Sequence, residues 1–281
     1  MRTLPFGPTG VAVPVLGQGT WNMERDGERE VLAALAAGID AGMTHIDTAE
    51  LYGSGRVERL VGRAIAGRRR EELFIVSKVL PSNASYRDTL AACERSLRRL
   101  GTDYLDVYLL HWRGGVPLAE TLRAFEELEA AGKIRAYGVS NFDVDDLEEA
   151  VSIAGEGRIA CNQVLYHLNE RSIEFAVLPW CRQHNVALVA YSPLGSGDFP
   201  SPRTAGGKVL AEIGERRGLT PHQVALAFLL QRSGGFAIPK AADTTHVLQN
   251  AAVGDVELEP EELERIDAAF PAKRRRGLAM I

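Results

Sequence analysis

The sequence predicts an α/β fold built as one (β/α)8 barrel of the TIM type. Short, nearly continuous apolar segments alternate with longer amphipathic stretches, and eight such pairs follow one another without a long Pro- or Ser-rich linker. The chain has 281 residues, and a barrel of this kind typically needs about 250. We therefore expect a single domain over residues 1–281, with parallel strands that are buried on both faces.

The order of the elements follows from the same alternation. A β-hairpin is expected first, from Arg2–Pro5 and Val11–Val13 around a Gly-Pro-Thr-Gly turn. The eight barrel strands are expected at Val15–Gly19, Thr44–Asp47, Leu73–Lys78, Leu105–Leu110, Ile134–Ser140, Ala160–Val164, Ala187–Ser192 and Phe236–Pro239. Helices are expected at Glu28–Ala41, Arg56–Ile65, Tyr86–Leu100, Ala119–Ala131, Val144–Ala154, Phe175–His184, Lys208–Arg217 and Pro221–Ser233. Two extra C-terminal helices are expected at Thr245–Val253 and Pro260–Phe270.

Composition narrows the class of partner. The net charge of -5 argues against a nucleic-acid binder, which would have a basic face. No apolar run reaches the length of a membrane span, and no secretory signal opens the chain. The three cysteines form no CxxC pair, as is typical of a reducing compartment, and the six histidines lack metal-ligand spacing. We expect a cytoplasmic monomer that binds no metal, membrane or nucleic acid.

Four polar residues lie at or just after the ends of the predicted strands. They are Asp47 in HIDT, Tyr52 five residues later, Lys78 in FIVSK and His111 in YLLHW. A packed core does not accept unpaired charges, so such residues either pair or take part in chemistry. In a parallel barrel they converge at the C-terminal ends of the strands, where active sites lie. The sequence therefore predicts an active site made of these four side chains.

The chemistry of this set points to carbonyl reduction. A phenol normally titrates near about pH 10. We expect Lys78, held against Asp47, to favour the ionised form of Tyr52 and to tune its acidity toward neutrality. His111 would bind and orient a carbonyl oxygen. Because no serine or cysteine is placed as a nucleophile, a hydride from a nicotinamide cofactor would complete the reaction.

These residues lie in segments that resemble the aldo-keto reductase family over essentially the whole chain. The segments are GMTHIDTAELYGSGRVERLVG, FIVSK, DYLDVYLLHW, GKIRAYGVSNF, NQVLYH, AYSPLG and AIPKA. The resemblance implies a (β/α)8 barrel that binds NADPH in an extended pose without a Rossmann fold. It also implies that the family's catalytic tetrad is Asp47, Tyr52, Lys78 and His111.

The resemblance further implies a set of cofactor-binding residues. Ser140, Asn141 and Gln163 would hold the nicotinamide carboxamide, and Tyr191 would stack on the nicotinamide ring. Lys240 would bind the adenosine 2′-phosphate. The remaining expected cofactor contacts are Gly19, Thr20, Asp47, Ser192, Leu194, His246, Gln249 and Asn250.

Two departures from the family pattern affect the choice of cofactor. Ala241 follows Lys240 where the family often has Ser or Thr, and His246 stands where it often has Arg. A hydroxyl and a permanently charged guanidinium are therefore missing around the expected phosphate. We expect NADPH to be the cofactor, with NADH as a weaker second candidate.

The substrate pocket is expected to be lined by Trp21, Tyr52, His111 and Trp112. The tail after Phe270 is short, which predicts an open pocket for a small-molecule carbonyl substrate. The segments GQGTW, CERSLRRL, NQVLYHL, LPWC and HVLQNAAV are similar to those of small bacterial family members that reduce methylglyoxal and other 2-oxoaldehydes.

Two alternatives to a reductase stay open at this point. Lys78 at a strand end could form a Schiff base in a barrel lyase. The chain could also be an NADPH-binding redox sensor or auxiliary subunit, a role in which the tetrad is kept without catalysis.

Overall fold

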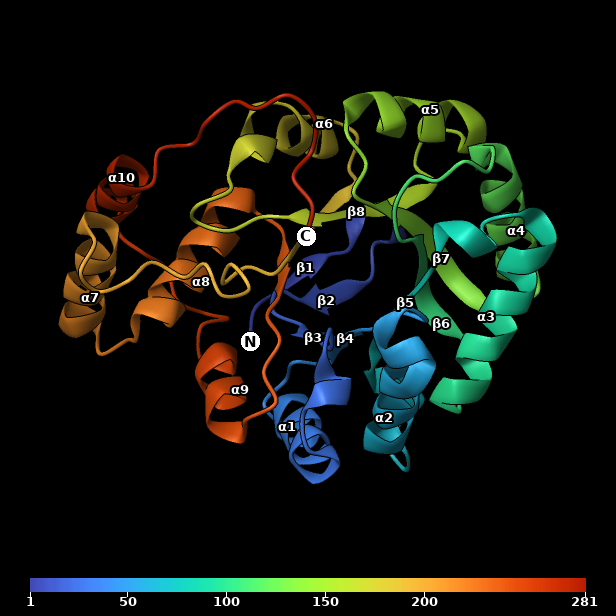
Figure 1. Cartoon of the computed structure of the whole chain (residues 1–281), viewed down its shortest axis with the longest axis horizontal. Helices are drawn as coiled ribbons and strands as arrows, with labels where there is room; N and C mark the ends of the chain where they lie inside the picture. Colours follow the sequence, from blue (N-terminus) through green and yellow to red (C-terminus); the bar gives the residue numbers. More distant parts are fainter.

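Eight parallel strands form the centre of the molecule in the computed structural model, which describes residues 1–281 (Figure 1). Neighbours in sequence are neighbours in the sheet. Leu16, just before the first strand, bridges to Ala237 in the last, and Gly19 in the first strand bridges to Lys240 just after the last, so the sheet closes. The (β/α)8 prediction is confirmed. The strands are β3 (Gln18–Gly19), β4 (His45–Asp47), β5 (Phe74–Val79), β6 (Leu105–Leu110), β7 (Ile134–Ser140), β8 (Ile159–Leu165), β9 (Ala187–Tyr191) and β10 (Phe236–Ile238).

Closure of the barrel depends on a glycine. A Cβ atom at Gly19 would lie 2.4 Å from the carbonyl oxygen of Ile238, which is far inside van der Waals contact. The Gly19 amide also donates to the Pro239 carbonyl at 3.2 Å. The glycine at the end of β3 therefore permits the first and last strands to meet at the mouth of the barrel.

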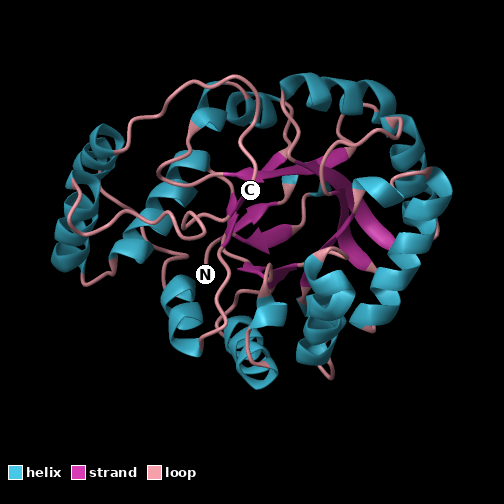
Figure 2. Ribbon diagram, in the orientation of Figure 1, coloured by secondary structure: helices cyan, strands magenta, loops and turns pink.

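Helices surround the barrel on its outside (Figure 2). They are α1 (Glu28–Asp40), α2 (Arg56–Ile65), α3 (Tyr86–Leu100), α4 (Leu118–Ala130), α5 (Val144–Ala154), α6 (Val177–Gln183), α7 (Ala205–Arg217), α8 (Pro221–Ser233), α9 (Thr244–Ala251) and α10 (Pro260–Ala269). All predicted helices are present. The largest boundary difference is at α7, which begins three residues early because Thr204 caps it by accepting the Gly207 amide at 3.0 Å.

The predicted N-terminal hairpin closes the lower end of the barrel. It consists of β1 (Thr3–Pro5) and β2 (Ala12–Pro14), which pair antiparallel. Phe6 follows β1 and is 1% exposed; its ring lies 4.8 Å from that of Phe74 and 4.9 Å from that of Phe236. Because the aromatic residues fill this end, the C-terminal ends of the strands are left as the accessible end of the barrel.

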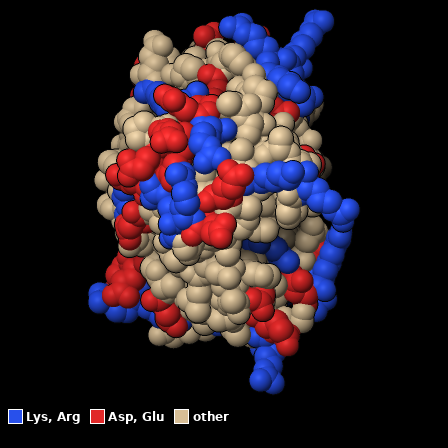
Figure 3. Space-filling model, turned by 90° about the vertical axis from the view of Figure 1, so that its left-hand side faces the viewer, with Lys and Arg blue, Asp and Glu red and all other residues tan.

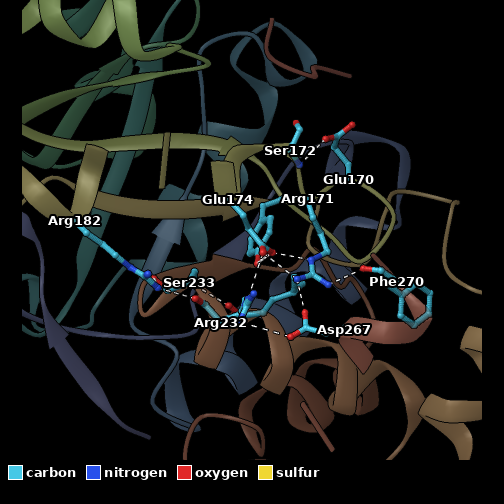
Figure 4. Close-up of polar contacts among 11 residues, drawn as sticks. Glu170, Arg171, Ser172, Glu174, Arg182, Arg232, Ser233, Asp267 and Phe270 are labelled. Carbon is cyan, nitrogen blue, oxygen red and sulfur yellow. Dashed lines mark hydrogen bonds and ion pairs between the residues drawn. The ribbon is translucent and has the colours of Figure 1, made fainter. Parts of the chain in front are cut away.

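A buried arginine ties the loop after β8 to the C-terminal part of the chain (Figure 4). The Arg171 guanidinium donates to both carboxylate oxygens of Glu174, at 2.7 and 2.9 Å, to Asp267 of α10 at 2.5 Å and to the Phe270 carbonyl at 2.6 Å. Its side chain is 2% exposed. The cluster fixes the point from which the tail after α10 returns across the barrel mouth, where Figure 1 places the C-terminus.

Charges of both signs are interspersed on the face that carries α7 and α10 (Figure 3). Ion pairs such as Arg265–Glu212 and Arg217–Glu262 connect these helices. No helix combines the length and the apolar character that crossing a bilayer requires.

Candidate active site

The four residues predicted to form the active site meet at the C-terminal end of the barrel. Asp47 is the last residue of β4, and Tyr52 begins the 3-10 turn Tyr52–Gly55 that follows it. Lys78 lies in β5, and His111 comes directly after β6. Parallel pairing of these three neighbouring strands aligns their ends, so side chains distant in sequence converge on one spot.

Lys78 is the centre of the group. Its side chain is fully buried, and its ammonium nitrogen donates to Asp47 Oδ1 at 2.5 Å, to the Thr48 carbonyl at 2.9 Å and to Tyr52 Oη at 3.2 Å. An ammonium group has three protons to donate. All three are therefore directed at acceptors, and one of them is the phenol.

Asp47 is held on both of its oxygens. Oδ1 accepts from Lys78, and Oδ2 accepts from the side-chain amide of Gln163 at 2.7 Å. The Thr20 hydroxyl donates to the Asp47 main-chain carbonyl at 2.8 Å. The carboxylate is 1% exposed, so these bonds replace the hydration that it has lost.

Burial and charge act against each other on the ionisable groups. Burial alone would lower the pKa of Lys78, but Asp47 and Tyr52 raise it, so the ammonium stays charged. Burial raises the pKa of Asp47 against the opposing effects of Lys78 and Gln163. Burial also raises the pKa of Tyr52, because the field of Lys78 offsets only part of the desolvation. Lys78 therefore favours the ionised form of Tyr52, as expected, but in the free protein burial outweighs this effect and the pKa of Tyr52 is not brought toward neutrality.

His111 is held uncharged next to the phenol. Burial and the charge of Lys78 lower the pKa of His111 to about 2. Its ring centroid lies 5.7 Å from that of Tyr52, in an edge-to-face arrangement. Nδ1 is buried without a hydrogen-bond partner. The imidazole is therefore neutral across the physiological range and has one nitrogen turned away from solvent.

Tyr52 and His111 face a cavity of about 270 Å³ at the barrel mouth, and Lys78 lies behind them. The other predicted residues in its wall are Gly19, Thr20, Trp21, Asp47, Trp112, Ser140, Asn141, Gln163, Tyr191, Ser192 and Lys240.

A larger groove of about 950 Å³ continues outward from this cavity and shares Trp21, Ser192 and Lys240 with it. The four remaining predicted cofactor residues lie along this groove: Leu194, His246, Gln249 and Asn250. The structure thus places all the predicted site residues in one continuous surface, except Lys78, which supports Tyr52 from within. No three or more His, Cys, Asp or Glu side chains are grouped closely enough to hold a metal ion.

Backbone strain is concentrated along the same surface. Six residues other than glycine have a positive φ, and four of them line the cavity or the groove: Asn22 (65°), Asn141 (60°), Ser192 (46°) and Ser196 (48°). Such conformations are costly and persist where the surrounding structure imposes them, most often at functional sites.

A chain of hydrogen bonds joins the residues expected to hold an amide. Tyr191 Oη donates to Asn141 Oδ1 at 2.9 Å, and Asn141 Nδ2 donates to Ser140 Oγ and to the His111 carbonyl, each at 3.1 Å. Ser140 Oγ donates to the Gln163 carbonyl at 2.8 Å. The chain fixes these polar groups in the cavity wall next to an aromatic ring, which suits a planar ring that bears a carboxamide.

Sequence reasoning missed part of the cavity wall. Met280 and Ile281 of the C-terminal tail line the cavity together with Leu51. The expectation that a short tail leaves the pocket open is therefore wrong, because the tail folds back over the barrel mouth. The path of the tail is fixed by tertiary contacts, such as the hydrogen bond from Arg171 to the Phe270 carbonyl. No local sequence pattern predicts these contacts.

Sequence reasoning also missed an ion pair of Lys240. Its ammonium nitrogen lies 2.5 Å from Asp26 Oδ2, in the loop between the first strand segment and α1. Asp26 lines the same groove. Neither its position in the sequence nor its neighbours suggested this contact, since 214 residues separate the two partners.

The geometry argues against a Schiff-base lyase. A lysine that forms a Schiff base must be uncharged and reachable by the substrate. Lys78 is fully buried behind Tyr52, bonded to three acceptors and held in its charged form. No feature of the site favours the redox sensor over the enzyme.

Comparisons with known proteins agree with this site. Residues 15–270 match the sequence profile of the Aldo/keto reductase family. The chain is 47% identical over 274 residues to methylglyoxal reductase YeaE of Escherichia coli, with 96% of each chain covered. It is 40% identical over 261 residues to glyoxal reductase of Bacillus subtilis, with 92% of this chain and 90% of that protein covered.

A solved structure is equally similar. The crystal structure of an aldo-keto reductase from Klebsiella pneumoniae in complex with NADPH superposes with a TM-score of 0.92 at 46% identity, covering 100% of this chain and 99% of that one. The profile match, the relatives and the barrel-mouth tetrad lead to one conclusion: the chain belongs to the aldo/keto reductase family and is an NADP-dependent oxidoreductase.

Proposed function

We propose that the enzyme reduces small aldehydes to alcohols with NADPH and that 2-oxoaldehydes such as methylglyoxal are its preferred substrates. The observation that carries the reaction is the Tyr52 hydroxyl, which faces the cavity 3.2 Å from the Lys78 ammonium. The names of two relatives, a methylglyoxal reductase and a glyoxal reductase, support the substrate class.

Tyr52 is the proton donor in this proposal. Its raised pKa keeps the phenol protonated at neutral pH, so the group enters the reaction with a proton to give. As the carbonyl oxygen takes that proton, negative charge develops on Tyr52 Oη. The ammonium of Lys78 lies in position to stabilise this charge, and Asp47 holds the ammonium in place.

His111 binds the carbonyl oxygen as a neutral donor. A proton on Nδ1 would be buried without an acceptor, so we assign the proton to Nε2, on the other edge of the ring. His111 lines the cavity, and its ring lies against Tyr52. The two donors would then hold one carbonyl oxygen between them and aim its carbon at the opposite wall.

The opposite wall and the outer groove would hold NADPH. Ser140, Asn141 and Gln163 would bind the carboxamide, and the Tyr191 ring would stack on the nicotinamide. Ser192 and Leu194 would contact the pyrophosphate. Lys240 and His246 would face the 2′-phosphate, and Gln249 and Asn250 the adenine, with Gly19, Thr20 and Asp47 completing the inner wall. When bound, NADPH supplies the hydride that reduces the carbonyl carbon.

The cavity favours small, uncharged substrates. Its volume of about 270 Å³ would be shared with the nicotinamide ring, and Trp21, Trp112, Met280 and Ile281 make its walls largely apolar. The nearby charge of Arg113 is taken up by Glu149 at 2.9 Å and Asp146 at 3.6 Å. Neither a steroid-sized ketone nor an anionic substrate finds a matching surface here.

A substrate competition tests the assignment. NADPH oxidation is followed with methylglyoxal, a short aliphatic aldehyde and an aldose at equal concentration. We expect the highest kcat/KM with methylglyoxal and a modest difference to the short aldehyde. Preference for the aldose or for a large ketone would contradict the substrate class and leave the reductase assignment standing.

Lys240→Ala tests the cofactor assignment. Loss of one charge-assisted contact is worth about 1.5–3 kcal/mol, or roughly one to two decades in affinity. We expect this loss for NADPH and almost none for NADH, measured by quenching of tryptophan fluorescence. Equal losses for both cofactors would mean that Lys240 supports the fold or the pyrophosphate instead.

We also propose a cytoplasmic monomer. The three cysteines are buried and unpaired, which suits a reducing compartment. Light scattering on the eluting protein should give a mass near the 30.6 kDa of one chain, and twice that mass would contradict the proposal.

A further inference from the structure

The ion pair between Asp26 and Lys240 lies where the two cavities join. Lys240 lines both of them, and Asp26 lines the outer groove. The two side chains are 32% and 33% exposed, and the atoms Oδ2 and Nζ are 2.5 Å apart. The one lysine assigned to the 2′-phosphate therefore already has an anionic partner supplied by the protein.

The groove as a whole is acidic for a site that takes a multiply charged anion. Its wall contains one lysine, Lys240, and three carboxylates, Asp26, Glu30 and Asp243. His222 and His246 also line the groove and could add charge only when protonated, and His246 lies 3.9 Å from Asp243. A bound phosphate at this end would meet more negative than positive groups.

Only one of these carboxylates is engaged with Lys240. Asp243 caps α9 by accepting the His246 amide at 3.1 Å. The Glu30 carboxylate folds back on Gly27, where a Cβ atom would lie 2.0 Å from its Oε2. Asp26 is thus the carboxylate whose presence changes what Lys240 can bind.

We propose that Asp26 is a specificity-determining residue, which weakens the preference for NADPH over NADH by competing with the 2′-phosphate for Lys240. The inference rests on the proposed role of Lys240. NADPH must share the lysine with Asp26 or open the ion pair, and in either case its phosphate must tolerate the Asp26 carboxylate nearby. NADH lacks the phosphate and leaves the ion pair intact.

The expected effect follows from the exposure of the pair. A partly exposed ion pair contributes little, and removing it together with the repulsion between Asp26 and the phosphate should tighten NADPH binding by roughly 3- to 10-fold. The affinity for NADH should change by less than about 2-fold. The ratio of the two affinities is the quantity that moves.

The test compares dissociation constants of NADPH and NADH for the wild type, Asp26→Asn, Lys240→Ala and the double variant. Trp21 and Trp112 line the cavities, so quenching of tryptophan fluorescence reports binding without turnover. Glu30→Gln is the matched control, because it removes a carboxylate from the same groove that does not contact Lys240. We expect Asp26→Asn alone to raise the NADPH preference.

The double variant separates the two proposals. If Asp26 acts through Lys240, most of the gain from Asp26→Asn disappears in the Lys240→Ala background. An unchanged or weakened NADPH affinity in Asp26→Asn, or an equal gain for both cofactors, would overturn the role of Asp26. If Lys240→Ala instead weakens both cofactors equally, the assignment of the 2′-phosphate itself fails.

Discussion

Two clusters in this barrel each combine a buried cation with carboxylates, but they have different roles. The inner cluster lies at the barrel mouth, where Lys78 is bonded to Asp47 and both side chains are almost fully buried. The outer cluster joins the loop after β8 to α10: Arg171 is bonded to Glu174 and Asp267, and the arginine is 2% exposed (Figure 4). Charges removed from water must be paired in either place, so burial by itself does not tell the two clusters apart.

The partners make the difference. Every arm of Arg171 ends on a carboxylate or a main-chain carbonyl, none of which lines the active-site cavity. Lys78 gives one of its bonds to the Tyr52 hydroxyl, which does line the cavity. A buried ion pair thus has a structural role when none of its partners lines the cavity. It can take part in chemistry when one of its partners faces the substrate.

The two carboxylates also respond differently. Burial raises the pKa of Glu174, but hydrogen bonds from Arg171 and Tyr166 outweigh it, so the pKa is lowered. At Asp47 the single ammonium and the Gln163 amide do not outweigh burial, and the pKa is raised. In the outer cluster the hydrogen bonds therefore favour the charged form of Glu174, whereas in the inner cluster burial disfavours the charged form of Asp47.

The largest expected effect is the loss of chemistry in Tyr52→Phe. The change keeps the ring and removes the hydroxyl that accepts a hydrogen bond from Lys78 and faces the cavity. Reduction of methylglyoxal should fall by a general-acid factor of about 10²–10⁴ in kcat/KM, with NADPH affinity retained.

Tyr191→Phe is the matched control for that experiment. It removes a phenol from the same cavity, but one that bonds the Asn141 amide and not an ammonium. We expect a loss of less than about 10-fold. Comparable losses in the two variants would mean that contact with Lys78 does not select the proton donor.

Next in size is the loss of stability in Arg171→Met, which leaves Glu174 and Asp267 without their buried cation. Breaking a buried pair from one side costs about 3–5 kcal/mol, so the free energy of unfolding measured in urea should drop by that amount. Activity per folded molecule at low temperature should stay within a few-fold of the wild type.

Arg182→Met provides the comparison for Arg171. Arg182 is an exposed arginine at the same wall that donates to the Arg232 and Ser233 carbonyls. Its loss should change the free energy of unfolding by less than about 1 kcal/mol. An equally large effect there would show that the wall depends on any arginine and not on the buried cluster.

The sequence predicted the inner cluster and not the outer one, for a physical reason. Asp47, Lys78 and His111 lie at or just after the ends of buried strands, and parallel strands bring their ends together by a rule that applies to every such barrel. Arg171 lies in a loop and donates a hydrogen bond to Asp267, which is 96 residues away in the sequence. This contact depends on tertiary packing that no local sequence pattern predicts. The Asp26–Lys240 pair and the return of Met280 into the cavity escaped prediction for the same reason.

The acid response of the outer cluster gives a smaller effect. The ordinary pKa of a glutamate is 4.5, and that of Glu174 is lowered in the folded protein. Its charge therefore stabilises the fold fully above pH 4.5, and this contribution is lost as the pH falls through the lowered value. The stability advantage of the wild type over Glu174→Gln should shrink on going from pH 7 to pH 4, as followed by Tm. An advantage that grows in acid would contradict the direction of the shift.

The smallest expected effect is the absence of a change, and it concerns the inner cluster. The pKa of His111 is lowered to about 2, and that of Tyr52 is raised from 10.0, so neither group changes its charge between pH 6 and pH 9. Reduction under kcat/KM conditions should then be flat across this range, without the inflection near pH 6.5 that an ordinary histidine produces. Histidine NMR signals give an independent reading, with His111→Gln to identify the signal of His111. That signal should not titrate above pH 5. A midpoint near 6.5 for His111 would mean that the histidine enters the reaction charged and that burial at the barrel mouth is not what sets its protonation.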